Sequence, residues 1–298
     1  MKVAIYSRGL DHDLKGQLVI LINALQKHDI SILLLESLAS YNLEVDQKGI
    51  SLFSHSNELD KSIDCLISLG GDGTILDAVA LVRDKNIPIL GINFGRLGFL
   101  AGIGKEELTT AVEALVSGTY VTDKRTLIHL DASIPLFGDT AFAINEFAIH
   151  KRDTSPMIKV HTYLNGEFLN TYWSDGVIVS TPTGSTGYNM SCNGPIVFPE
   201  SSSFVITPVA PHNLNVRPIV VPDSNIISFE IEGRAEQIIC ALDARREIVD
   251  KDIQLAVKRE IPFWSTSRLY DASDSNNKIP MSCFCNALSS MTNCPLRS

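Results

Sequence analysis

The sequence predicts two domains of different class: an α/β domain with a parallel sheet, followed by an all-β sandwich. Residues 1–118 alternate short apolar runs with segments of helical period, whereas short β-rich runs between turn residues occupy 119–260. A length of 298 residues also suits about two domains of ~150 residues. We therefore expect domains over 1–118 and 119–260, and a poorly ordered tail over 261–298, which is rich in Ser, Asn and Cys.

The first domain follows from its alternation of periods. We expect strands over 3–7, 30–35, 64–69 and 87–92, and helices over 14–27 and 105–117. Gly118 is a suitable stop for the second helix. Such alternation is typical of a parallel sheet flanked by helices, in which ligands bind beyond the carboxyl ends of the strands.

The second domain is predicted from short strand-like runs with frequent Gly and Pro between them. Asn165-Gly166 separates two of these runs and strongly indicates a hairpin. The expected strands are 127–130, 140–149, 158–164, 167–171, 176–180, 204–209 and 226–231. Their regular spacing favours a sandwich.

Composition narrows the class of protein. A net charge of −9 and a pI near 5.3 argue against a nucleic-acid partner. The apolar run 18–25 is far shorter than the ~20 residues of a membrane span, and the first residues show no signal-peptide pattern, so we expect a cytoplasmic protein without a membrane partner. Cys65, Cys192 and Cys240 are expected as free thiols, and the tail cysteines Cys283, Cys285 and Cys294 lack zinc-knuckle spacing.

The glycine turn Gly70-Gly71-Asp72-Gly73 is the first candidate for chemistry. It lies between a predicted strand and a helix-compatible segment, where backbone N–H groups can hold a phosphate. A carboxylate in such a turn repels phosphate unless it binds a metal or takes a proton from a hydroxyl. Asp72 is therefore either a catalytic carboxylate or an Asp that only bonds its own turn.

Two further segments favour a sugar or a nucleotide as ligand. Asn145-Glu146 offers an amide beside an acceptor carboxylate, which suits the adjacent hydroxyls of a ribose, although a solvated strand end is the alternative. Asp175 leads through a short strand into 181–188, a loop of small and hydroxyl residues that ends at Tyr188. Asp243 is expected in a surface turn. The sequence contains neither a P-loop nor a Gly-x-Gly-x-x-Gly motif.

In this order the motifs resemble the bacterial NAD kinase family over about residues 1–260. The resemblance rests on 70–74, on 91–100, on Asn145-Glu146, on Asp175-Gly176 with 181–188, and on Pro211-His212 with Arg217-Pro218. It implies a two-domain fold like that of NAD kinase. It also implies an enzyme that phosphorylates the adenosine-ribose 2′-hydroxyl of NAD to give NADP, with ATP and Mg²⁺, or polyphosphate, as donor.

The resemblance also assigns roles by position. Asp72 is expected as the catalytic base, and no residue is expected to bind a metal by itself. In the family the two domains face each other across a cleft, and homo-oligomers, dimers or tetramers, are common. The residues expected to bind NAD are Gly73, Asn145, Glu146, Asp175, Thr183, Thr186, Gly187, Tyr188, Asn189, Met190, Ser191 and Ala210.

Two other functions stay open at this stage. A lipid kinase of the diacylglycerol type shares the glycine turn, but the acidic composition speaks against a membrane face. A nucleotide-binding module without activity is the other, because relatives end with a strand and a docking segment that the sequence after Glu260 lacks. NAD binding without NADP formation would favour that module.

Overall fold

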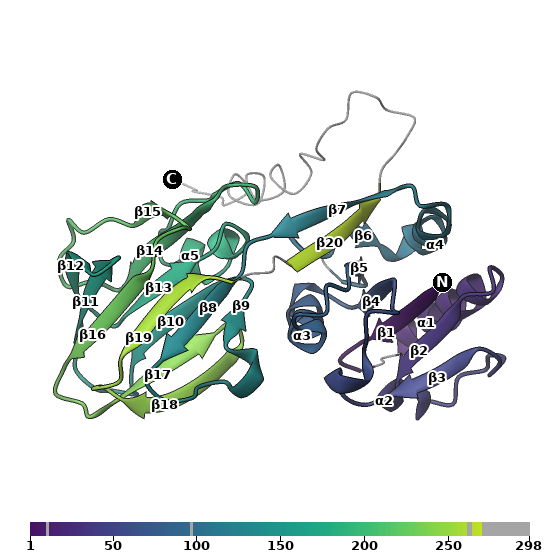
Figure 1. Cartoon of the computed structure of the whole chain (residues 1–298), viewed down its shortest axis with the longest axis horizontal. Helices are drawn as coiled ribbons and strands as arrows, with labels where there is room; N and C mark the ends of the chain where they lie inside the picture. The colour runs from purple at the N-terminus through teal and green to yellow at the C-terminus, as the bar shows by residue number, and fades with distance from the viewer. Residues whose placement is uncertain (10–11, 96–97, 261–263, 270–298) are drawn as a thin grey trace, which may run out of the picture. The chain divides into compact units, whose positions relative to one another are not determined.

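A computed structural model describes residues 1–9, 12–95, 98–260 and 264–269 of the chain (Figure 1). The chain divides into two compact units. The first comprises Met1–Asp123 and receives the chain again from Ser265, and the second comprises Lys124–Trp264. Each unit contains its own hydrophobic core.

The first unit contains a sheet whose order is β3-β2-β1-β4-β5-β20-β7, with β6 paired to β5. Its strands are β1 (Lys2–Tyr6), β2 (Ser31–Leu35), β3 (Ile50–Phe53), β4 (Cys65–Leu69), β5 (Ile89–Asn93), β6 (Ile103–Gly104), β7 (Tyr120–Arg125) and β20 (Trp264–Leu269). Strands β1 to β5 pair in parallel, as the sequence predicts. The central strands β4 and β5 are buried throughout, which explains their continuous apolar runs.

Helices on both sides of this sheet complete the unit. They are α1 (His12–Gln26), α2 (Glu36–Ala39), η1 (Ser56–Glu58), α3 (Asp72–Val82), η2 (Lys105–Glu107) and α4 (Leu108–Ser117). Apolar residues of α1 and α4 share one core cluster with alternate residues of β1 and β4. Gly118 ends α4 in the left-handed conformation that favours glycine, with a φ of 71°.

Helix α1 contains one residue that limits its stability. Gly16 is exposed in the helix interior, and a Cβ added there would meet nothing within 4 Å. We expect Gly16→Ala to stabilise the first unit by about 0.5–1 kcal/mol, because Ala loses less backbone entropy in a helix. Urea denaturation followed by far-UV circular dichroism measures this, and an unchanged or lower midpoint would contradict it.

The second unit is a sandwich of two six-stranded antiparallel sheets, ordered β15-β14-β13-β10-β17-β18 and β12-β11-β16-β19-β8-β9. The first sheet contains β10 (Glu146–Lys151), β13 (Gly176–Ser180), β14 (Ser203–Val209), β15 (Ile219–Pro222), β17 (Gln237–Leu242) and β18 (Arg245–Asp250). The second contains β8 (Ile128–Ala132), β9 (Phe142–Ala143), β11 (Ile158–Leu164), β12 (Glu167–Ser174), β16 (Ile227–Glu232) and β19 (Leu255–Arg259).

Large apolar side chains from both sheets, among them Phe147, Tyr172 and Phe204, form the sandwich core. The hairpin predicted at Asn165-Gly166 joins β11 to β12, and both turn residues have positive φ, 51° and 86°. The remaining helical turns of this unit are η3 (Gly138–Thr140), η4 (Thr183–Thr186) and α5 (Tyr188–Ser191). Cys65, Cys192 and Cys240 are free thiols, and Cys192 is only half-buried.

Two expectations about local structure differ from what is observed. The run 140–149 is not one strand, because η3, β9 and a turn at 144–145 precede β10. The segment after Glu260 does contain a strand, β20, whose Thr266 pairs in parallel with Ile89 of β5. Backbone pairing of this kind needs no apolar run, so composition does not reveal it. The rest of the expected tail, 270–298, lies outside the described residues. Among the residues that the structure does describe, no helix is long and apolar enough to cross a membrane.

Candidate functional site

In the first unit, the glycine turn connects β4 to α3 and places Asp72 in the first turn of that helix. Gly70 has a φ of 148°, and a Cβ there would lie 2.3 Å from Thr74 Oγ1, so only glycine fits. Gly71 precedes the helix without any side-chain cap. Thr74 N donates to Gly71 O at 2.9 Å, so the N–H groups of Asp72 and Gly73 are the ones suited to an anion at this helix start.

The Asp72 carboxylate accepts three hydrogen bonds from the backbone of the segment after β5. Phe99 N donates to Oδ2 at 2.8 Å, and Leu100 N and Ala101 N donate to Oδ1 at 3.0 and 3.1 Å. A carboxylate offers about four lone-pair positions. These bonds fix the side chain yet leave one position on Oδ2 that can accept a proton from a hydroxyl.

Gly98 permits this close packing. A Cβ added there would lie 2.1 Å from Oδ1 of Asp72 and 2.4 Å from its Cγ. The segment that follows β5 can therefore reach the carboxylate only because residue 98 is glycine. The resemblance covers this segment without giving it a role, and the structure shows that it holds Asp72.

Arg8, which the sequence did not single out, lies beside the start of α3. Its Nη2 donates to Asp77 Oδ1 at 2.9 Å and its Nε to Oδ2, and a Cβ at Gly73 would lie 3.0 Å from its Nη1. The Arg8 side chain is half exposed. A guanidinium next to a helix N-terminus is a suitable environment for phosphate.

In the second unit, Asn145 and Glu146 form the turn that leads into β10. The backbone carbonyl of Asn145 accepts a bond from Thr181 N at 2.8 Å. Glu146 Oε2 is buried without a hydrogen-bond partner in the described part of the chain. Burial, with a further contribution from the charge of Asp243, raises the pKa of Glu146 to about 8.

The loop after β13 folds over this turn. A Cβ at Gly187 would lie 3.4 Å from Glu146 Oε2, and one at Gly184 would lie 2.1 Å from the Asn145 carbonyl oxygen. The Tyr188 ring packs against His150 with centroids 5.5 Å apart. Burial raises the pKa of the Tyr188 hydroxyl, with smaller contributions from Cys192, Glu146 and Asp175, so Tyr188 faces acidic groups at both ends of β10.

Other residues of the loop after β13 are buried and stabilise its conformation. Asn189 is fully buried, donates from Nδ2 to Ser185 O and Pro195 O at 3.0 Å each, and accepts from Thr207 Oγ1 at 2.6 Å. Its side chain is therefore fully engaged within the fold. Thr183 is also buried, Thr186 and Met190 are half-buried, and Ser191 is exposed.

Asp175 and Ala210 lie together at the far end of β13. Asp175 N donates to Val209 O at 2.9 Å, and its carboxylate is 2.7 Å from Lys151 Nζ. Ala210 has a φ of 44° and precedes Pro211, a strained combination for a residue with a side chain. The structure thus gathers Asn145, Glu146 and Gly187 at the start of β10 and Asp175 and Ala210 near its other end, with Tyr188 packed on His150 and close to the acidic groups at both ends.

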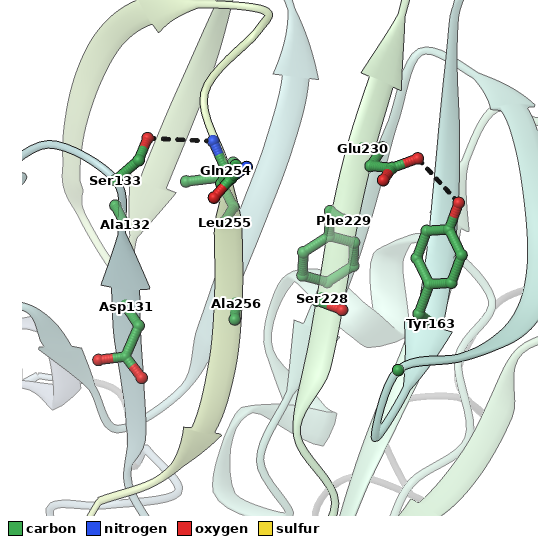
Figure 2. A pocket seen from close by; sticks show the side chains of 11 residues that line it. Asp131, Ala132, Ser133, Tyr163, Ser228, Phe229, Glu230, Gln254, Leu255 and Ala256 are labelled. Atoms are coloured by element: carbon green, nitrogen blue, oxygen red, sulfur yellow. Dashed lines mark hydrogen bonds between the residues drawn. The ribbon is translucent and has the colours of Figure 1, made fainter.

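A separate hollow of about 550 Å³ lies on the other sheet, where β16 and β19 diverge (Figure 2). Tyr163 donates to Glu230 at 2.8 Å on one wall, and Asp131 and Gln254 line the other. None of the residues predicted for the site lines this hollow, so it is a poor candidate for the site.

Two family models match the sequence. Residues 41–120 match the ATP-NAD kinase N-terminal domain, and residues 144–258 match the ATP-NAD kinase C-terminal domain. The NAD kinase of Cytophaga hutchinsonii is 50% identical over 263 residues, which cover 87% of this chain and 90% of that protein. The NAD kinase of Flavobacterium psychrophilum is 44% identical over 269 residues, with coverage of 88% and 90%.

Solved structures have the same two folds. A crystal structure of an NAD kinase from Archaeoglobus fulgidus in complex with ATP superposes with a TM-score of 0.73 at 26% identity, over 97% of this chain and 99% of that one. A yeast NADH kinase complexed with NADH gives a TM-score of 0.81 at 22% identity, over 100% and 89% of the two chains. The second similarity concerns the fold alone.

Proposed function

This chain belongs to the NAD kinase family, and from that premise we propose that it transfers the terminal phosphoryl group of ATP to the adenosine-ribose 2′-hydroxyl of NAD. The observation that carries the proposal is Asp72, a carboxylate fixed by three backbone N–H bonds that keeps one acceptor position on Oδ2. In the step, the ribose oxygen bonds to the γ-phosphorus, the bond from phosphorus to the oxygen of ADP breaks, and Asp72 Oδ2 takes the hydroxyl proton.

We assign the remaining residues to binding. The N–H groups at the start of α3 and the Arg8 guanidinium are suited to the phosphates of the donor. Asn145 and Glu146 are suited to ribose hydroxyls, and Tyr188 to stacking on a base or a ribose. The residues proposed to surround NAD further comprise Gly73, Asp175, Thr183, Thr186, Gly187, Met190, Ser191 and Ala210, while Asn189 supports their loop.

A divalent cation fits this arrangement as a companion of ATP. The described residues contain no group of three or more His, Cys, Asp or Glu side chains that could hold a metal ion. Mg²⁺ commonly binds through one or two carboxylates together with phosphates and water. The one acceptor position left on Asp72 is assigned to the hydroxyl proton, so the ion would be held mainly by the phosphates of ATP and by water, where it would neutralise charge on the phosphates.

We also propose that several copies associate in the cytoplasm. The edge strands β12 and β15 of the two sandwich sheets expose large apolar side chains, and Phe168, Trp173 and Val220 are 62%, 48% and 52% exposed. Exposed strand edges of this kind tend to pair with another chain. A sedimentation velocity run that gives a single monomer at micromolar concentration would contradict this.

The direct test is NADP formation from NAD with ATP, and separately with polyphosphate, by the full chain. We expect turnover with at least one donor, and NAD binding in calorimetry without any NADP would instead support an inactive binding module.

We further expect a chain ending at Glu260 to melt at a lower temperature, because β20 lies between β5 and β7 in the first sheet. An equally stable truncated chain would show that β20 contributes nothing to the fold.

A further inference from the structure

Asp243, expected in a surface turn, lies with its carboxylate against the Asn145-Glu146 turn. It occupies the tight turn between β17 and β18 with a φ of 52°. Its Oδ1 accepts from Asn145 N at 2.8 Å and from Glu146 N at 3.1 Å, and its Oδ2 accepts from Ile144 N at 3.0 Å. One side chain thus binds three consecutive N–H groups of the residues that precede and begin β10.

The same three residues are held from their carbonyl side as well. Thr181 Oγ1 donates to Ile144 O at 2.5 Å, and Thr181 N donates to Asn145 O at 2.8 Å. Asp243 N completes the set by donating to Glu146 O at 3.0 Å. Every N–H and C=O group from Ile144 to Glu146 therefore has a partner, and four of these six bonds involve Asp243. Loss of Asp243 would leave buried N–H groups unsatisfied.

Asp243 also contributes a negative charge close to the carboxyl group of Glu146. Three titratable groups face the Glu146 side chain: Asp243 from the β17–β18 turn, and Tyr188 and Cys192 from the loop after β13. Within the described part of the chain none of these three neighbours is a cation. Burial raises the pKa of Asp243, but its three backbone N–H bonds and the charge of Arg245, which donates to Thr140 O and Phe142 O, act in the opposite direction and favour its ionised form. Burial and the charge of Asp243 together raise the pKa of Glu146 to about 8, so Glu146 holds a proton near neutrality.

We propose that Asp243 is a positioning residue for NAD, which fixes the Asn145-Glu146 turn and makes nucleotide binding depend on the loss of a proton from Glu146. The inference rests on the proposed function, in which ribose hydroxyls donate to Glu146. A hydroxyl donates best to an ionised carboxylate. Glu146 therefore gives up its proton when NAD binds, and the affinity for NAD rises with pH until Glu146 is ionised in the free protein.

Calorimetry of NAD binding to the full chain between pH 6.5 and 8.5 tests this linkage. With a Glu146 pKa of about 8, the dissociation constant should fall roughly 25-fold over this range, because the ionised fraction rises by that factor. In Asp243→Asn the neighbouring charge is gone but the burial of Glu146 remains, so we expect a smaller change than in the parent over the same range and weaker binding at pH 8.5. A parent protein with no pH dependence, or a variant with the parent's dependence, would overturn the proposal.

Two further variants separate this role from a merely structural one. Asp223→Asn removes another buried carboxylate of the same unit, one that pairs with Arg259 at 3.2 Å, and should keep the parent's pH dependence. Glu146→Gln cannot ionise and should abolish the dependence even if Asp243→Asn does not fold. A pH dependence that survives in Glu146→Gln would assign the proton to another group and overturn the inference.

Hydrogen exchange provides a readout that needs no nucleotide. The amides of Ile144, Asn145 and Glu146 should exchange at least about tenfold faster in Asp243→Asn than in the parent and in Asp223→Asn, since their acceptor is altered. Unchanged exchange in a folded variant would refute the positioning role. Failure of the parent to form NADP would count against the proposed function, whereas these exchange rates test Asp243 by itself.

Discussion

Replacing Asp72 by Asn is expected to lower kcat for NADP formation by about 10²–10⁴-fold, the usual range for loss of a general base. An amide has nearly the same shape as a carboxylate but cannot take the hydroxyl proton. In this chain both carboxylate oxygens already accept backbone N–H bonds, and only Oδ2 has room for a further donor. Steady-state kinetics with saturating ATP and NAD measure the effect directly.

The same substitution also disturbs the segment after β5, and the test must distinguish the two effects. The new NH₂ group would face at least one of the three N–H donors, so some loss of stability is expected alongside the loss of rate. Asp13→Asn removes an exposed carboxylate of the same unit, which pairs with Lys105 at 2.7 Å, and should leave kcat unchanged. A rate for Asp72→Asn within threefold of the parent would end the case for Asp72 as the base.

Four strands of the first sheet could be predicted, because a strand that is buried on both faces of a sheet consists of consecutive apolar residues. β1, β2, β4 and β5 all appear at the expected places, within one to two residues. β17 and β18 were not predicted, since β18 begins with three consecutive charged residues and the turn that joins the two strands, Asp243-Ala244, has no glycine. β20 was not predicted either, because its pairing with β5 depends on backbone groups and not on composition.

The candidate site could be predicted only in part, because a residue whose role depends on backbone groups far away in the chain stands in no local sequence motif. Asp72, Asn145 and Glu146 stand in recognisable local motifs, so their sequence context points to chemistry. Asp243 has no such context, and its importance arises from three N–H groups almost a hundred residues away in the chain. Those bonds also explain why the run 140–149 is interrupted, since N–H groups that bind a carboxylate are not free to continue a strand ladder.

The role of Arg8 was not predictable for a related reason. It follows the first strand without any motif around it, and only the structure places its guanidinium beside Gly73 and Asp77. Parallel strands bring their carboxyl ends to one edge of the sheet, so residues after β1 and after β4 meet there. A search of every strand end for cations would have found Arg8 in the sequence.

Gly184→Ala is the second substitution with a large expected effect, and it acts on the NAD half of the site. A Cβ at residue 184 would lie 2.1 Å from the Asn145 carbonyl oxygen, 2.5 Å from its carbon and 2.6 Å from Cα. These are backbone atoms, so no side-chain rotation relieves the clash, and either η4 or the Asn145-Glu146 turn must move. We expect a loss of about 1–3 kcal/mol in stability and at least a tenfold rise in KM for NAD, about 1.4 kcal/mol.

Gly233→Ala is the matched control, because the same change there approaches one side-chain methyl group, and the nearest backbone atom is 3.9 Å away, an ordinary contact. Its new Cβ would lie 3.2 Å from Ile158 Cγ2, a methyl group that can shift by a few tenths of an ångström. Thermal melts of the two variants should therefore differ, and only Gly184→Ala should raise KM for NAD. If Gly184→Ala kept both the parent's melting temperature and its KM, the close contact between η4 and Asn145 would not matter for NAD. A lower melting temperature with an unchanged KM would restrict that contact to stability, because a displaced Asn145-Glu146 turn must weaken any ribose bound there.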